Sequence, residues 1–261
     1  MKVTNPYFKQ ASADEAKTLD SIEVTACTKT GICLKTLFCI VAAIIAGLVV
    51  AITFNRAIYD GALSDTQKAD MLSRMLTFLI IAVIVSFFAS LIGRIAPKSA
   101  VVCAPLYSVG EGAAIGLLCA MAELEVAGVT IVAGLGTALI FGLSLLAYSL
   151  GLKNKMGTVF TFLVVFLLAA VLSSLGLVLF TVFNPGVQVS LGLLLAIELI
   201  YLAYASFCLL TNFKEVDVLV ERGSDKKYEW SVALGLVISI LYLFVELIRI
   251  ILIIASMFQK D

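Results

Sequence analysis

Long runs of apolar residues, separated by short polar segments, fill most of this chain of 261 residues. A helix that crosses the hydrocarbon core of a bilayer needs about 20 mostly apolar residues. Seven runs approach or exceed that length, at residues 37–54, 76–96, 101–122, 127–151, 157–182, 189–211 and 231–258. We therefore predict an all-α integral membrane fold, with a polar tail over residues 1–35 and one seven-helix membrane domain over residues 36–261.

Composition supports this class and excludes others. Hydrophobic residues make up 62% of the chain and charged residues 14%. Soluble domains hold about 45–50% apolar residues and about 25% charged residues. The net charge is zero, so no basic surface for nucleic acid is indicated. The expected partners are the lipid bilayer and other membrane proteins, and the composition implies no particular oligomeric state.

Lysine and arginine are distributed unevenly between the two sides of the predicted bundle. Placing the N-terminus in the cytoplasm puts thirteen of these residues inside and four outside. Because positive residues accumulate in cytoplasmic loops, we predict a cytoplasmic N-terminus and an external C-terminus. A multi-pass protein of this kind is expected in the plasma membrane.

The last apolar run carries a polar stripe. Ser239, Tyr242, Glu246 and Arg249 are three or four residues apart, so they share one helix face. A carboxylate within a membrane helix costs roughly 2–3 kcal/mol to insert, and such residues face the bundle interior or a water-filled cavity. Two interpretations stay open: a Glu246–Arg249 pair that fixes helix packing, or a titratable gate or cation site at Glu246.

Two further carboxylates lie within apolar runs. Glu111 precedes a glycine, where a close helix neighbour is expected, and both a packing role and a site role are open for it. Glu198 is expected near the outer end of its span, where its side chain reaches toward the headgroups, and a site role is the weaker alternative for it. The chain has no histidine, so any pH sensor near neutrality would have to be a desolvated carboxylate.

Motifs for catalysis and for metal binding are missing from the sequence. We find no HExxH, GxSxG, P-loop or dinucleotide-binding pattern, and therefore expect neither enzymatic activity nor a cofactor. Cys27 and Cys33 come without any histidine, which makes a zinc site unexpected.

The C-terminal third resembles the Bax inhibitor/YccA-like family of membrane proteins, also called transmembrane Bax inhibitor motif proteins, and a prokaryotic branch most. Three segments carry the resemblance: Asn212–Asp217, Glu221–Trp230 and Leu243–Arg249. Weaker matches come from Asn5–Phe8, Lys35–Thr36 and Leu106–Gly112. The stronger and weaker matching segments follow one another in the same order as in the family, and together they extend over most of the chain.

The resemblance implies a seven-helix bundle with the last helix in its centre. It also implies a pH-sensitive calcium leak, gated by two carboxylates on the sixth and seventh helices that share a proton. Glu246 is the acid on the last helix, although the family's acid falls nearer Ser239. The sixth-helix position matches Asn212, which cannot titrate.

Two acids just beyond Asn212 offer replacements for the missing carboxylate. Glu215 or Asp217 could act if the sixth helix continues to about Arg222 and stops at Gly223. The first hypothesis, which the resemblance implies, is a calcium leak whose gate includes Glu246 as a transient ligand of Ca²⁺. The alternatives are a non-conducting protein that binds membrane partners such as proteases or stress-response components, and a proton-coupled carrier of small solutes.

Overall fold

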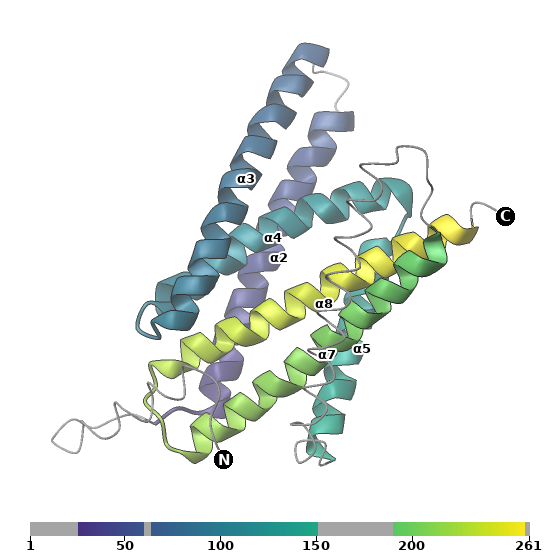
Figure 1. Cartoon of the computed structure of the whole chain (residues 1–261). Coiled ribbons are helices and arrows are strands. Elements are labelled where there is room, and N and C mark those ends of the chain that lie inside the picture. The colour runs from purple at the N-terminus through teal and green to yellow at the C-terminus, as the bar shows by residue number, and fades with distance from the viewer. Residues whose placement is uncertain (1–25, 60–63, 151–189, 259–261) are drawn as a thin grey trace, which may run out of the picture. The chain divides into compact units, whose positions relative to one another are not determined.

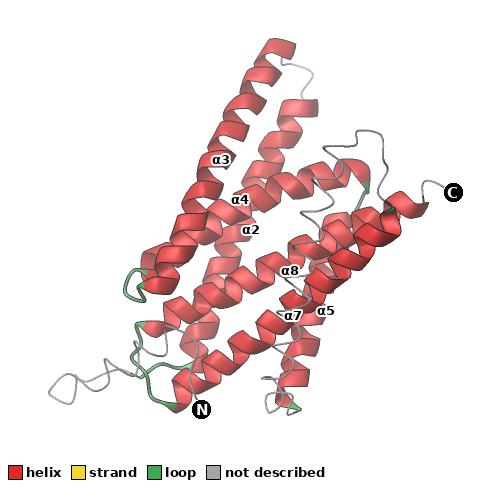
Figure 2. Ribbon diagram, viewed as in Figure 1, coloured by secondary structure: helices red, strands yellow, loops and turns green. Residues whose placement is uncertain are grey.

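The computed structural model describes residues 26–59, 64–150 and 190–258. Helices and the short loops between them make up the described part of the chain, with one isolated bridge between Ala26 and Asp225 (Figure 2). They are α2 (Lys29–Tyr59), α3 (Asp65–Ile95), α4 (Ala100–Glu125), α5 (Val129–Ser149), α7 (Leu191–Glu221) and α8 (Tyr228–Phe258), labelled in Figure 1.

Each of these six helices is long and apolar enough to cross a membrane. The predicted span at 157–182 lies outside the described residues. Several helices extend beyond the apolar run that predicts them. The first helix begins at Lys29, inside the segment expected to be a tail, and α7 continues to Glu221.

The predicted end of α7 is confirmed at Gly223. This glycine has a φ of 65°, a left-handed conformation that costs about 1–2 kcal/mol per residue for other amino acids. The amide of Ser224 donates to the carbonyl of Leu219, and that of Gly223 donates to Val220. These bonds close the helix end and turn the chain toward α8.

Two other helix starts follow local signals. Ser64 and Gln67 form a reciprocal capping box at the start of α3, the pattern that satisfies free amides at a helix N-terminus. Before α5, both carboxylate oxygens of Glu123 accept backbone amides, from Gly128 at 2.7 Å and Thr130 at 2.9 Å. Glu123 therefore has a structural role as a cap.

The described chain divides into two compact units. Unit 1 comprises Met1–Ala120 and Glu215–Ile238, and unit 2 comprises Met121–Lys214 and Ser239–Asp261. Helices α4, α7 and α8 contribute residues to both.

In unit 1, α2 and α4 approach closely through small residues. A side chain at Gly112 would overlap the backbone of Ala43, and one at Gly116 would overlap that of Gly47. Val50, Leu79 and Ala113 form a buried cluster. The GxxxG pair is thus a packing motif, as such pairs commonly are in lipid.

In unit 2, α5 packs on both α7 and α8. Phe141 of α5 meets Phe213 of α7 edge to face, with ring centres 5.5 Å apart. Gly134 and Gly136 of α5 face Phe244 and Leu247 of α8. Many large apolar side chains on α2, α3 and α5 are exposed, as expected for helices that face lipid.

Candidate functional site

Glu246 of α8 is the centre of the candidate site. Its side chain is 0% exposed, in a helix of mostly apolar residues. The helical spacing of the stripe brings Ser239, Glu246 and Arg249 toward α7, because each of them has a partner on that helix. The predicted shared face is therefore present within unit 2.

Arg249 lies between two carboxylates. Its Nη1 atom is 3.5 Å from Oε1 of Glu246 and 4.0 Å from Oε1 of Glu198. The Glu198 side chain is 17% exposed, and that of Arg249 is 52% exposed. Two acids therefore face one cation, and the cluster carries one net negative charge when both acids are ionised.

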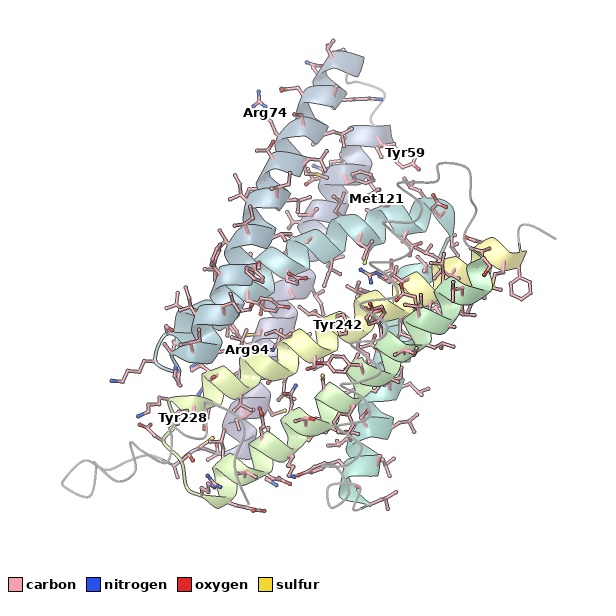
Figure 3. The ribbon with its side chains drawn as sticks, in the orientation of Figure 1. Tyr59, Arg74, Arg94, Met121, Tyr228 and Tyr242 are labelled. Carbon is pink, nitrogen blue, oxygen red and sulfur yellow. The ribbon has the colours of Figure 1, made fainter. Side chains whose placement is uncertain are left out.

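Hydrogen bonding at Glu246 is incomplete. The hydroxyl of Tyr242 lies beside the carboxylate, and Tyr201 of α7 lies beside Tyr242; Tyr242 is labelled on α8 in Figure 3. Among the described residues, no well-aligned hydrogen bond reaches either oxygen of Glu246 or Oε2 of Glu198. Buried polar atoms are nearly always satisfied in native proteins, so these oxygens are open to a proton or a cation.

Asn212 and Ser239 form a second polar contact between α7 and α8. The amide of Asn212 donates to the hydroxyl of Ser239 at 2.7 Å. These are the two positions at which the family resemblance places the proton-sharing acids. This chain has a neutral pair there and has carboxylates further along the same two helices.

The other predicted site residues belong to unit 1. Asp217 pairs with Lys29 at 2.5 Å, and Glu215 is half-buried on the same helix. Glu111 of α4 is half-buried beside Tyr107. The structure thus pairs Glu246 with Glu198, and it places Glu215, Asp217 and Glu111 in the unit that does not contain Glu246.

Glu198 is the functional candidate that sequence reasoning ranked last. It does not lie alone at the headgroups, because its carboxylate interacts with both Glu246 and Arg249. The signal that could have identified it is the short turn between α7 and α8. Antiparallel helices that bring Asn212 to Ser239 also bring the start of α7 to the end of α8.

Among the residues that the structure describes, no group of three or more acids, cysteines or histidines gathers that could hold a metal ion. Calcium sites use six to eight oxygen ligands. The Glu198–Glu246 pair offers at most four carboxylate oxygens, which is fewer than such a site uses.

These features define a multi-pass, all-helical membrane protein with a buried, incompletely satisfied carboxylate pair. The family described as Bax inhibitor 1 like matches residues 5–256. The chain belongs to that family. A search of curated proteins finds no match.

Proposed function

We propose that this protein conducts cations as a calcium leak, and that its gate is the cluster of Glu246, Glu198 and Arg249. The observation that supports this most is the full burial of Glu246 without a well-aligned hydrogen bond among the described residues. A protein that used this acid only to fix helix packing would gain stability by satisfying it. The family resemblance also supports the proposal, because it implies a pH-sensitive bundle of seven helices.

The charge balance of the cluster indicates how it would work. Arg249 neutralises one of the two carboxylates, and it is half-exposed, so it can move without disturbing the helix backbone. The remaining charge attracts either a cation or a proton, and both compete for the same oxygen atoms. Flux is therefore expected to depend on pH, with no histidine needed.

The count of seven spans is part of this proposal. The amide of Cys27, just before α2, donates to the carbonyl of Ser224, just after α7. The two residues therefore lie on one side of the membrane, which requires an even number of crossings between them. Five described helices account for five crossings, and the run at 157–182 is long enough to supply the sixth. The N-terminus is then cytoplasmic by the distribution of positive residues.

Calcium flux into liposomes that hold the full-length protein tests the proposal, measured from about pH 5 to about pH 8. Flux should vary with pH in the wild type and lose that dependence in Glu246→Gln and in Glu198→Gln. Glu221→Gln is the matched control, because Glu221 is an exposed acid at the end of the same helix as Glu198. Unchanged flux and unchanged pH response in both gate variants would overturn the assignment.

A second candidate function is that of a non-conducting protein that binds membrane partners. The neutral Asn212–Ser239 contact favours it, because the positions expected to carry the gate cannot titrate. No flux at any pH, together with a specific membrane protein recovered by crosslinking, would establish this alternative over the channel. Flux that depends on Glu246 would exclude it.

A further inference from the structure

The first turn of α2 receives its cap from another helix. The backbone amide of Thr28 donates to Oε1 of Glu229 at 2.9 Å, and the Thr28 hydroxyl donates to the same oxygen at 3.2 Å. The Thr28 hydroxyl also accepts the amide of Gly31 at 3.0 Å. In an ordinary capping box, the acid that accepts the first amide comes from the third residue of the same helix. Here that residue is Gly31, and Glu229 of α8 takes the role.

Gly31 makes room for the incoming carboxylate. A Cβ atom at this position would lie 2.5 Å from both carboxylate oxygens of Glu229, well inside van der Waals contact. Glu229 is fully buried, and its second oxygen pairs with Lys35 of α2. Sequence and geometry agree. The capping box Thr28–Gly31 has a glycine where an acid is usual, and the absence of a side chain there leaves space for Glu229 of α8.

Further contacts join the same two segments. The Lys35 ammonium lies over the ring of Trp230, 5.4 Å from its centre, and Phe38 meets that ring edge to face at 6.2 Å. The start of α8 is marked by Tyr228 in Figure 3. Three kinds of contact thus join residues 26–38 to residues 224–230: a β-bridge, the buried Lys35–Glu229 ion pair and the cation–π contact of Lys35 with Trp230.

We propose that Glu229, Thr28, Gly31 and Lys35 form an interhelical latch, in which the first turn of α2 and the start of α8 are held or released together. The latch goes beyond the proposed function, since it concerns unit 1 alone and does not depend on ion conduction. Releasing Glu229 removes the cap of α2 and the anchor of α8 in one step. The segment that contains Cys27 then leaves the α7–α8 turn.

Cys27 is a built-in reporter of the latch. Its side chain is 3% exposed. Burial and, less strongly, the nearby Glu229 charge together raise the pKa of the Cys27 thiol to about 11, against the opposing effect of Lys35. Because the thiolate is the reacting species, Cys27 should react slowly while the latch is closed. Cys33 on α2 is exposed and serves as an internal reference.

Maleimide labelling of the full-length protein, quantified for each cysteine by mass spectrometry, tests the latch. Gly31→Ala should speed labelling of Cys27 relative to Cys33 by about tenfold, since it displaces the carboxylate and loses a helix cap. This variant removes no charged group, so faster labelling cannot come from deletion of the Glu229 carboxylate. Gly192→Ala is the control, because nothing lies within 4 Å of a Cβ there.

Moving the acid from residue 229 of α8 to residue 31 of α2 distinguishes an interhelical latch from a cap that acts on α2 alone. In the double variant Gly31→Glu, Glu229→Gly, the box Thr28–Gly31 regains an acid of its own, and the link to α8 is lost. The latch predicts that Cys27 still labels fast in this variant. Protection of Cys27 in the swap would overturn the latch, and so would unchanged labelling in both Gly31→Ala and Glu229→Gln.

Discussion

At the scale of single residues, α8 carries two fully buried acids with opposite surroundings. Glu229 receives donors from Thr28 and Lys35 at both of its oxygens. Glu246 has Arg249 at 3.5 Å and no well-aligned hydrogen bond among the described residues. A satisfied buried acid stabilises one arrangement, whereas an unsatisfied one leaves its charge state open to change. This contrast supports our proposal that Glu246 has a functional role, whereas Glu229 holds two helices together.

The coupling between Arg249 and the two acids gives the first prediction at this scale. Arg249→Met should lower the midpoint of thermal unfolding in detergent at neutral pH, because both carboxylates lose their shared cation. Solvent screening at the half-exposed guanidinium keeps the loss moderate. Adding Glu246→Gln to Arg249→Met should recover part of it, since one uncompensated charge is then removed.

The control for this cycle is Arg74→Met. Arg74 pairs with Asp70 on the exposed surface of α3, where an ion pair contributes little. The midpoint of thermal unfolding of the Arg74→Met variant should stay near that of the wild type. If the effects of Arg249→Met and Glu246→Gln simply add, the two residues are not coupled and the cluster is not a unit.

Sequence reasoning placed two of the three residues of this cluster on one polar face. Glu246 and Arg249 stand out because spacing along one helix fixes which residues share a face. Glu198 does not stand out, because its place beside Glu246 depends on how far α7 is shifted along α8 and on how each helix is rotated. Those quantities are set by side-chain packing between helices, for example by Asn212 against Ser239, and a single sequence does not encode them locally.

At the scale of helices, hydropathy predicted the six helices that the structure describes but not where they end. It finds only the part of a helix that lies in hydrocarbon, and α2, α3 and α7 continue into polar sequence. The ends themselves follow from caps. Gly223 was readable from sequence as a stop, whereas the cap at Thr28 was not, because its acid comes from a distant helix.

The contact between α2 and α4 gives the second prediction. Gly116→Leu should strongly destabilise the fold, because the new side chain would meet the Gly47 backbone and force the helices apart. Overpacking of this kind typically costs about 1–3 kcal/mol. Denaturant titration of the purified protein in detergent measures the change.

Gly142→Ala is the matched control for that substitution. It introduces a side chain on α5 at a glycine with nothing within 4 Å. The change should be neutral or slightly stabilising, because alanine favours a helix over glycine by about 1 kcal/mol. Equal effects of the two substitutions would show that the small-residue contact does not hold α2 against α4.

At the scale of the whole molecule, the contact of Cys27 with Ser224 restricts the topology. It places the start of α2 and the turn before α8 on one side of the membrane. Because α8 itself is long and apolar enough to cross, we expect the chain after it on the opposite side. The two termini should therefore be separated by the membrane, with the N-terminal side in the cytoplasm.

Cysteine labelling in intact cells with a membrane-impermeant maleimide tests this arrangement. Lys260→Cys should label from outside, whereas Lys2→Cys should label only after the membrane is permeabilised. Lys226→Cys, in the exposed turn before α8, should behave like Lys2→Cys, because the turn shares its side with the start of α2. Labelling of Lys226→Cys and Lys2→Cys from opposite sides would mean an odd number of crossings between them. The run at 157–182 would then not cross, and the contact between Cys27 and Ser224, with the latch built on it, would not form in the membrane.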